Sequence, residues 1–235
     1  MHFSHSAAIW AAFPELVPGL LLVQGIDGTP DVTPRLAPYL ARARARLDAA
    51  GAESALPEVA AWRRAYARMG LKPTQYRSAA EALLRRFRRE GDLPRLHPLV
   101  DLCNAVSLAF ALPVAVFDLG GITGFLEVRH ARGDERYLAF SGETETPDPG
   151  EVIFADAAGE VHARRWTFRQ SRRSTVSPET HTALIVSEGL HAAAAADVPA
   201  LLDALAGEIG TVWGPPTARA VLTAAAPRWD APAGR

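Results

Sequence analysis

Residues 93–119, LPRLHPLVDLCNAVSLAFALPVAVFDL, decide the fold, because they join a buried helix to a buried strand. Pro98 suits the first turn of a helix, where an N–H group has no helical partner, and Pro113 cannot continue a helix. We therefore expect a helix over residues 98–110. Apolar residues cover most of its circumference, so it should be buried on most sides. The VAVF sequence after Pro113 is typical of a buried strand.

Three small polar side chains interrupt this helix at three-residue spacing, and they are Asp101, Asn104 and Ser107. On a helix this spacing places them in one narrow stripe. Because the rest of the helix is buried, the stripe faces either water or a pocket. Spacing alone does not separate a solvated stripe from a set of buried hydrogen-bond anchors. For Asp101 we expect a structural role, as an acceptor for the backbone of a neighbouring loop.

The rest of the sequence predicts helices followed by strands. Helical periodicity occurs at residues 34–50, 57–69 and 79–90, and a glycine follows or closely follows each segment. Another helix is expected after Asp197, which suits a helix cap. Alternating or continuous apolar patterns predict strands. These lie at residues 20–26, 114–117, 125–130, 136–140, 152–155, 161–167 and 182–187.

This order predicts an α+β fold in which N-terminal helices pack on a meandering, mostly antiparallel β core. We expect one domain over residues 1–214. Its helical portion should cover about 31–111, and its β-rich portion about 112–190. Residues 215–235 are rich in proline and alanine. They are expected to form a tail with one edge strand at residues 220–223.

Composition restricts the possible functions. A net charge of −1 gives no global attraction to polyanions. The only cysteine, Cys103, excludes an internal disulfide and a multi-cysteine metal site, and it is best explained as a buried structural thiol. The seven histidines lack the spacing of metal ligands, so we expect no metal and no cofactor. The sequence has no signal peptide and no apolar run near the ~20 residues of a membrane helix. We therefore expect a soluble, cytoplasmic protein that binds neither DNA nor membranes.

The densest basic run, residues 164–173 (RRWTFRQSRR), interleaves arginines with aromatic residues. On a strand, Arg164, Trp166 and Phe168 would share one face. Such a surface can stack a base and neutralise phosphates. The competing interpretation is a sheet with one solvated arginine face, and the residues alone favour it.

Four motifs together resemble the editing domain of the phenylalanyl-tRNA synthetase beta chain, which its third and fourth modules form. They resemble still more the free-standing relatives of that domain. The motifs are VDLCN, LPVAVFDL, GEVIFAD and RRWTFRQ, in the order and spacing of that group. Weaker similarity covers about residues 13–213. The resemblance implies the α+β fold of the editing domain and a tRNA partner recognised at its aminoacylated acceptor end.

The functional residues of the resembling family carry over only in part. Asn104 matches the asparagine that ends the helix motif. The synthetase histidine falls near Ala115, and residues 170–173, which match its glutamate-bearing turn, contain no carboxylate. The synthetase's specificity for tyrosine therefore does not carry over.

The resemblance nevertheless implies a site. Asn104 would position a ribose hydroxyl or a water, because an amide both donates and accepts hydrogen bonds, and Ser107 could assist it. The expected substrate-binding residues are Trp166, Arg169, Gln170 and Arg172.

The first functional hypothesis is a trans-editing deacylase of mischarged aminoacyl-tRNA. An aminoacyl ester is already activated, so a positioned water and oriented donors would suffice. Two alternatives stay open, a non-catalytic tRNA- or RNA-binding module and a small-molecule-binding or hydrolytic enzyme on the same scaffold. The sequence names neither the amino acid, the tRNA nor the oligomeric state.

Overall fold

The helix that follows Pro98 has the predicted bounds in the computed structural model, which describes residues 1–232. Helix α5 (Pro98–Phe110) begins after His97, whose Nδ1 accepts a hydrogen bond from the Leu99 N–H at 3.2 Å. It ends at Ala111, whose φ of 56° is left-handed. Most of its side chains are buried, as its apolar circumference predicts.

Strand β3 (Val114–Asp118) follows α5 directly and forms one edge of a four-stranded sheet. The strand order is β11-β2-β10-β3, and all neighbours are antiparallel. The other members are β2 (Val17–Gln24), β10 (Thr182–Gly189) and β11 (Ala218–Val221). Strand β10 lies between β2 and β3 and is buried along almost its whole length.

A second, eight-stranded sheet has the order β12-β1-β4-β7-β8-β5-β6, with β9 paired to β8. The pairs β1–β4 and β5–β8 are parallel and the remaining pairs are antiparallel, so the β core is mostly antiparallel as predicted. The strands are β1 (His2–His5), β4 (Phe125–His130), β5 (Arg136–Leu138), β6 (Thr144–Glu145), β7 (Val152–Asp156), β8 (Glu160–Arg164), β9 (Arg169–Gln170) and β12 (Arg228–Asp230).

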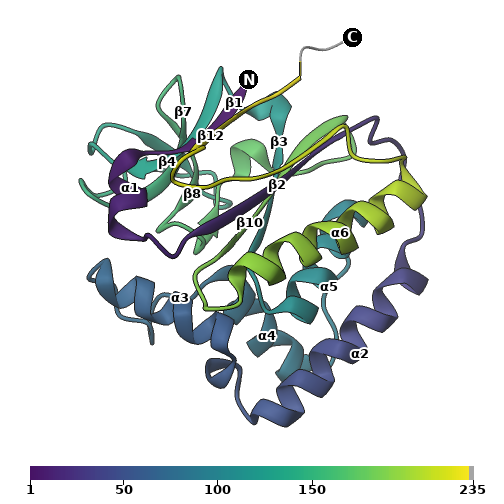
Figure 1. The fold of residues 1–235 in the computed structure, drawn as a ribbon. Helices are drawn as coiled ribbons and strands as arrows, with labels where there is room; N and C mark the ends of the chain where they lie inside the picture. The colour runs from purple at the N-terminus through teal and green to yellow at the C-terminus, as the bar shows by residue number, and fades with distance from the viewer. Residues whose placement is uncertain (233–235) are drawn as a thin grey trace.

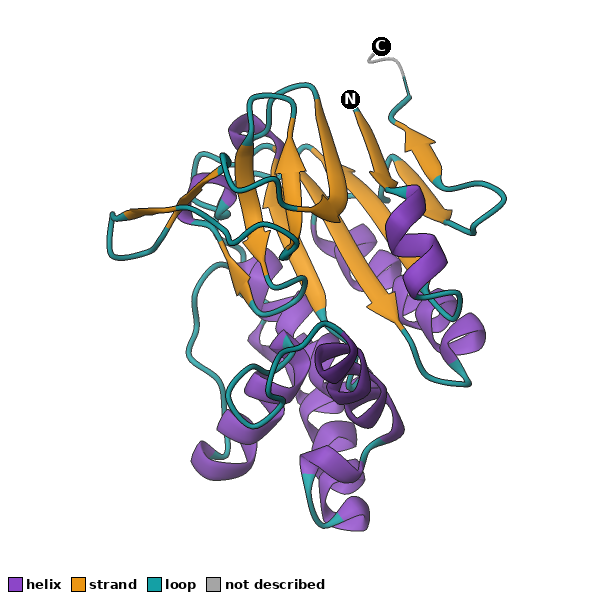
Figure 2. Cartoon of the chain, turned by 90° about the vertical axis from the view of Figure 1, so that its left-hand side faces the viewer, coloured by secondary structure: helices purple, strands orange, loops and turns teal. Residues whose placement is uncertain are grey.

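The helices other than α1 (Ala7–Ala12) gather on one side of the molecule and the strands on the other, with α1 beside the strands (Figures 1 and 2). The three helices predicted before α5 are present. Within residues 1–232, no helix has both the length and the apolar character needed to span a bilayer. The α-helices besides α5 are α1 (Ala7–Ala12), α2 (Thr33–Ala50), α3 (Pro57–Arg68), α4 (Ala79–Glu90) and α6 (Ala194–Val212). Short 3₁₀ turns cover Glu53–Ala55, Leu119–Gly121 and Arg172–Ser174.

The four-stranded sheet separates two apolar layers. Leu21 and Ile185 of its strands belong to a buried cluster that includes Val106 of α5 and Leu202 of α6. Leu184, on the opposite face, belongs to the cluster that includes residues of the larger sheet, of α1 and of α3. The apolar run of β10 follows from this position, because a strand covered on both faces has no solvent side.

The sequence patterns did not predict strands β1 and β12, whereas the edge strand predicted at residues 220–223 is present as β11 with shifted bounds. Strand β1 pairs with β4, and β12 pairs with β1, with His2 opposite Asp230. Strand β11 begins two residues before the predicted edge strand. Strands β1 and β12 have four and three residues, which is too short for an alternating pattern to stand out.

The predicted strand at residues 161–167 is wrong at its C-terminal end. Strand β8 stops at Arg164, because Arg165 and Trp166 both adopt left-handed backbone angles, with φ of 46° and 60°. The Arg165 N–H donates to a Glu151 carboxylate oxygen at 3.1 Å, and the Trp166 N–H donates to the Val152 carbonyl at 2.7 Å. The predicted alternation of arginine and aromatic faces is therefore absent, and the turn redirects the residues that follow.

Candidate functional site

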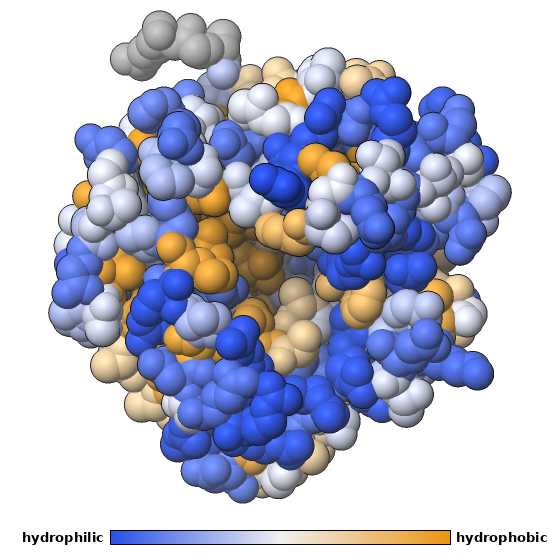
Figure 3. All heavy atoms as spheres, turned by 180° about the vertical axis from the view of Figure 1, so that it is seen from behind, coloured by the Kyte–Doolittle hydropathy of each residue, from blue (hydrophilic) through white to orange (hydrophobic). Residues whose placement is uncertain are grey.

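Two pockets adjoin where β3, β10 and the segment after the Trp166 turn meet. Val114 and Gln170 line both of them. The larger pocket has a volume of about 500 Å³, and the smaller a volume of about 60 Å³. On the face opposite to that of Figure 1 the surface is hollowed, and hydrophobic residues are exposed inside the hollow (Figure 3). We call the pocket of about 500 Å³ the large pocket and the pocket of about 60 Å³ the small pocket.

The large pocket combines a few polar side chains with exposed apolar side chains. Leu96 and Phe140 line it and are 68% and 63% exposed, although both are large hydrophobic residues. Single exposed apolar residues are ordinary, but two that line the same pocket offer a surface for a flat ligand. The polar lining includes His97, Asn104 and Gln170.

The polar stripe of α5 divides into three different environments. The Asp101 carboxylate accepts a hydrogen bond from the Leu96 N–H at 2.9 Å, which confirms its predicted structural role. Asn104 lines the large pocket, and within residues 1–232 no hydrogen bond involves its side-chain amide. Ser107 is fully buried, and its hydroxyl donates to the Leu112 carbonyl at 2.6 Å. Ser107 therefore fixes the turn after α5 and lines neither pocket.

His97 and Asn104 both line the large pocket. Burial lowers the pKa of this imidazole, while the Asp101 carboxylate acts in the opposite direction. The neutral form is therefore favoured near neutral pH. Because Nδ1 accepts the Leu99 N–H, the neutral ring carries its hydrogen on Nε2.

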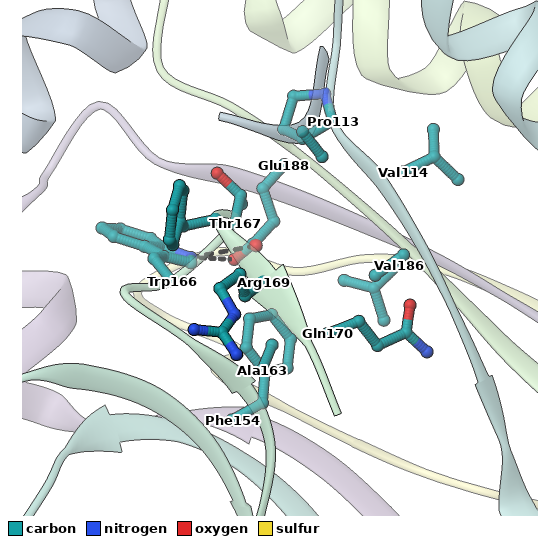
Figure 4. A pocket seen from close by; sticks show the side chains of 13 residues that line it. Pro113, Val114, Phe154, Ala163, Trp166, Thr167, Arg169, Gln170, Val186 and Glu188 are labelled. Carbon is teal, nitrogen blue, oxygen red and sulfur yellow. Dashed lines mark hydrogen bonds between the residues drawn. The ribbon is translucent and has the colours of Figure 1, made fainter. Parts of the chain in front are cut away.

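Gln170 lines both pockets, and Figure 4 shows it among the side chains that line the small pocket. Its Nε2 donates to the Val116 carbonyl at 2.7 Å and to the Ser174 carbonyl at 3.3 Å. Both amide hydrogens are thus engaged by the backbone. The Oε1 atom remains as an acceptor for a ligand, so Gln170 suits a hydroxyl, an ammonium or a water better than a carbonyl.

The small pocket contains a carboxylate that sequence reasoning missed. Glu188 of β10 is buried, and its two carboxylate oxygens accept hydrogen bonds from the Trp166 indole N–H at 3.0 and 2.9 Å (Figure 4). One of them also lies 2.6 Å from Nε2 of His5. The indole N–H of Trp62 donates to the Glu188 carbonyl at 3.3 Å. The sequence feature that could have revealed Glu188 is a carboxylate inside the otherwise apolar strand sequence TALIVSEG.

Trp166 serves as a wall of this pocket. The side chain is fully buried, and its ring packs edge-to-face against Trp62 and Phe13, with centroids 5.0 and 4.8 Å apart. A ring in that environment has no free face on which an RNA base could stack. The stacking role considered for Trp166 therefore does not fit its position, and its lining role does.

The arginines of the basic run lie in different environments. Arg164 is buried and paired with Glu145 at 2.5 Å and Glu151 at 2.7 Å. Arg169 lines the small pocket, and its guanidinium donates to Glu145 at 3.1 Å. Arg172 is exposed, and within the described residues it forms no ion pair. Of the two arginines predicted to bind the substrate, Arg169 and Arg172, Arg172 is therefore the more available to a phosphate.

Two groups with nucleophilic character line neither pocket. Cys103 is buried, which raises the pKa of its thiol and confirms its structural role. The Ser174 hydroxyl lies 3.0 Å from Nδ1 of His162, and Nε2 of the same ring lies 3.4 Å from Asp156. All three of these side chains are buried, so no substrate reaches the serine.

Comparison with known proteins places this architecture in a family. The phenylalanine–tRNA ligase beta subunit of Thiobacillus denitrificans is 38% identical over 76 residues, which are 32% of this chain and 10% of that protein. The subunit from Cereibacter sphaeroides is 37% identical over 73 residues, which are 31% and 9%. The match thus spans about a tenth of the length of these relatives.

A crystal structure of an N-terminal fragment of the phenylalanyl-tRNA synthetase beta-subunit from Pyrococcus horikoshii aligns with 93% of this chain and 49% of its own, with a TM-score of 0.48 and 10% identity. The family model described as "B3/4 domain" matches residues 61–198, from α3 into α6. This range includes β3, β10, Asn104 and Gln170. Because this match covers more than half of the sequence, the chain belongs to the B3/4 domain family.

Proposed function

We propose that the chain hydrolyses the ester that links a wrong amino acid to the terminal adenosine of tRNA. One observation carries the proposal: Gln170 lines two adjoining pockets of very different size, and Asn104 lines the larger one. An aminoacyl-adenosine needs two such compartments, one for the nucleoside and one for the amino-acid side chain. Family membership and the tRNA ligase relatives support the same assignment.

The large pocket suits the terminal adenosine. Its volume of about 500 Å³ lies within the ~300–1,000 Å³ typical of small-molecule sites. The exposed ring of Phe140 offers a stacking surface for the base. The unengaged amide of Asn104 can both donate to and accept from a ribose hydroxyl.

The small pocket restricts the amino acid. An apolar cavity of about 150 Å³ binds benzene, whereas this pocket has about 60 Å³. We therefore infer that the substrate carries a small side chain and that aromatic amino acids are excluded. Such a filter is useful because a synthetase separates side chains differing by one methylene by only ~1–3 kcal/mol.

The reaction needs no protein nucleophile. The oxygen of a water attacks the ester carbonyl carbon, the bond from that carbon to the ribose oxygen breaks, and the ribose oxygen leaves with a proton. Free amino acid and uncharged tRNA are the products. In this scheme Gln170 Oε1 accepts a hydrogen bond from the attacking water, and Asn104 holds the ribose or donates to the developing oxyanion. The burial of Cys103 and Ser107 agrees with a water-based mechanism.

The direct test is the release of amino acid from tRNAs charged with a panel of amino acids. We expect release above the buffer rate for at least one small amino acid on a wrong tRNA, and none for phenylalanine or tyrosine. Retained tRNA binding with release at the buffer rate throughout would favour the non-catalytic binding module. Absence of both binding and release would favour a small-molecule enzyme.

Neutralising Arg169 and Arg172 should weaken tRNA binding without unfolding the protein. Each phosphate contact that is lost should reduce the slope of log affinity against log salt by roughly 0.7–0.9. The measurement is a salt series of tRNA binding for the wild type and the double variant Arg169→Gln/Arg172→Gln.

The matched control for this experiment is Arg86→Gln/Arg89→Gln, which removes the same charge from α4. Both of these arginines pair with Glu90 on an exposed helix face. The control should keep the wild-type slope. If both double variants reduce the salt slope equally, only the net charge of the protein matters. If Arg169→Gln/Arg172→Gln keeps the wild-type slope, the RNA contact lies elsewhere.

A further inference from the structure

Three side chains with metal-ligand chemistry meet outside both pockets. Glu58 lies in the first turn of α3, His191 in the loop between β10 and α6, and Asp197 in the first turn of α6. Each offers a ligand atom, and these atoms all lie within 4.8 Å of one another. The sequence gives no sign of this cluster, because more than 130 residues separate Glu58 from the other two.

The hydrogen bonds around the cluster leave two buried atoms without partners. Nε2 of His191 lies 2.8 Å from Asp197 Oδ2, and Oε1 of Glu58 accepts a hydrogen bond from Arg46 at 2.6 Å. The remaining atoms, Glu58 Oε2 and His191 Nδ1, are buried and have no hydrogen-bond partner. These side chains are only 7% and 3% exposed. Buried polar atoms are normally paired, so two in one cluster require an explanation.

We propose that Glu58, His191 and Asp197 bind one divalent transition-metal ion, with Zn²⁺ as the expected ion. An imidazole nitrogen and carboxylate oxygens form a ligand set that Zn²⁺ accepts. Ca²⁺ and Mg²⁺ prefer oxygen ligands throughout. The ion would bind Nε2 of His191 in place of the proton shared with Asp197 Oδ2, and it would supply the missing partner for Glu58 Oε2.

The surrounding contacts fit a metal site. Nε2 of His191 and Oδ2 of Asp197 lie 2.8 Å apart, so a nitrogen ligand and an oxygen ligand are already side by side. Arg46 holds the second oxygen of Glu58 and thereby fixes the direction of the first. Asp197 is 36% exposed, which leaves a path from solvent to the cluster. Two carboxylates and one guanidinium leave a net negative charge for a cation to neutralise.

Such an ion would tie α3 to the loop that follows β10. His191 stands three residues after Glu188, and Trp62, one turn after Glu58 on α3, bonds to the Glu188 carbonyl. The ion would therefore stiffen the end of the strand that carries the small-pocket carboxylate. This site is independent of the proposed deacylation, because none of its three residues lines either pocket.

The test is calorimetric titration of the chelator-treated full chain with Zn²⁺. We expect one equivalent to bind to the wild type and to raise the melting temperature. His191→Gln and Glu58→Gln should each lower the affinity by more than tenfold. The matched control is His130→Gln, which removes an exposed imidazole at the end of β4 and should leave the affinity unchanged.

Titration with Co²⁺ gives a second readout, since its visible spectrum reports the ligand set. If the two buried variants do not fold, Asp197→Asn alters the half-exposed ligand and should still weaken binding and change that spectrum. The proposal is overturned if the wild type binds no stoichiometric Zn²⁺. It is also overturned if the folded variants, or Asp197→Asn in their place, bind as tightly as His130→Gln.

Discussion

The Glu188→Ala variant should lose about 3–5 kcal/mol of unfolding free energy, because it removes a buried carboxylate from its partners. Nε2 of His5 and the indole N–H of Trp166 would both lose their acceptor in the core. Each buried polar group left unsatisfied costs about 1–3 kcal/mol. Urea denaturation of the wild type and the variant measures the difference.

Two controls separate this effect from a general loss of charge. Glu188→Gln keeps an acceptor oxygen and should lose less stability than the alanine variant. Glu90→Ala removes a carboxylate paired on an exposed helix face, where substitutions usually change stability by less than about 0.5 kcal/mol. A loss below about 1 kcal/mol in Glu188→Ala would show that the carboxylate does not organise this part of the core.

The Asn104→Ala variant should reduce kcat for deacylation by about 100- to 1,000-fold, with little loss of stability. One oriented donor in a closed site typically contributes ~2.7–4 kcal/mol to lowering the barrier. The side chain lines the large pocket and, within residues 1–232, has no hydrogen bond to lose. Single-turnover deacylation and urea denaturation of the same preparation give both quantities.

Ser107→Ala is the matched control, three residues along the same helix. It leaves the Leu112 carbonyl without its donor and should lose about 1–3 kcal/mol of stability while keeping kcat. The two variants are thus expected to show opposite profiles. If Asn104→Ala keeps its activity, or if it unfolds as readily as Ser107→Ala, Asn104 is not a site residue.

The central helix could be predicted from sequence because its limits are local. Pro98 and Pro113 bracket the apolar segment, and α5 occupies the interval between them as expected. The end of β8 could not be predicted in this way. Arg165 and Trp166 adopt angles that non-glycine residues rarely take, and contacts with residues 151–152 hold them there. No pattern within residues 160–170 contains that information.

In the candidate site, too, local sequence patterns predict some residues and miss those whose role depends on contacts with distant segments. Asn104 and Gln170 line pockets, whereas Ser107 lines none and Trp166 is a fully buried wall, because the packing of other elements decides which side of a segment is covered. Glu188 lies 183 residues from His5 in the chain, so their contact depends on how β1 meets the small sheet. Spacing motifs do not detect such a pair.

The most direct test of the account compares two aminoacyl esters on the same tRNA, one with a small side chain and one with an aromatic side chain. The account predicts that wild-type protein releases the small amino acid above the buffer rate, that the aromatic ester is stable, and that Asn104→Ala abolishes the difference. Release at the buffer rate for every small amino acid tested, or equal release of the aromatic one, would contradict it.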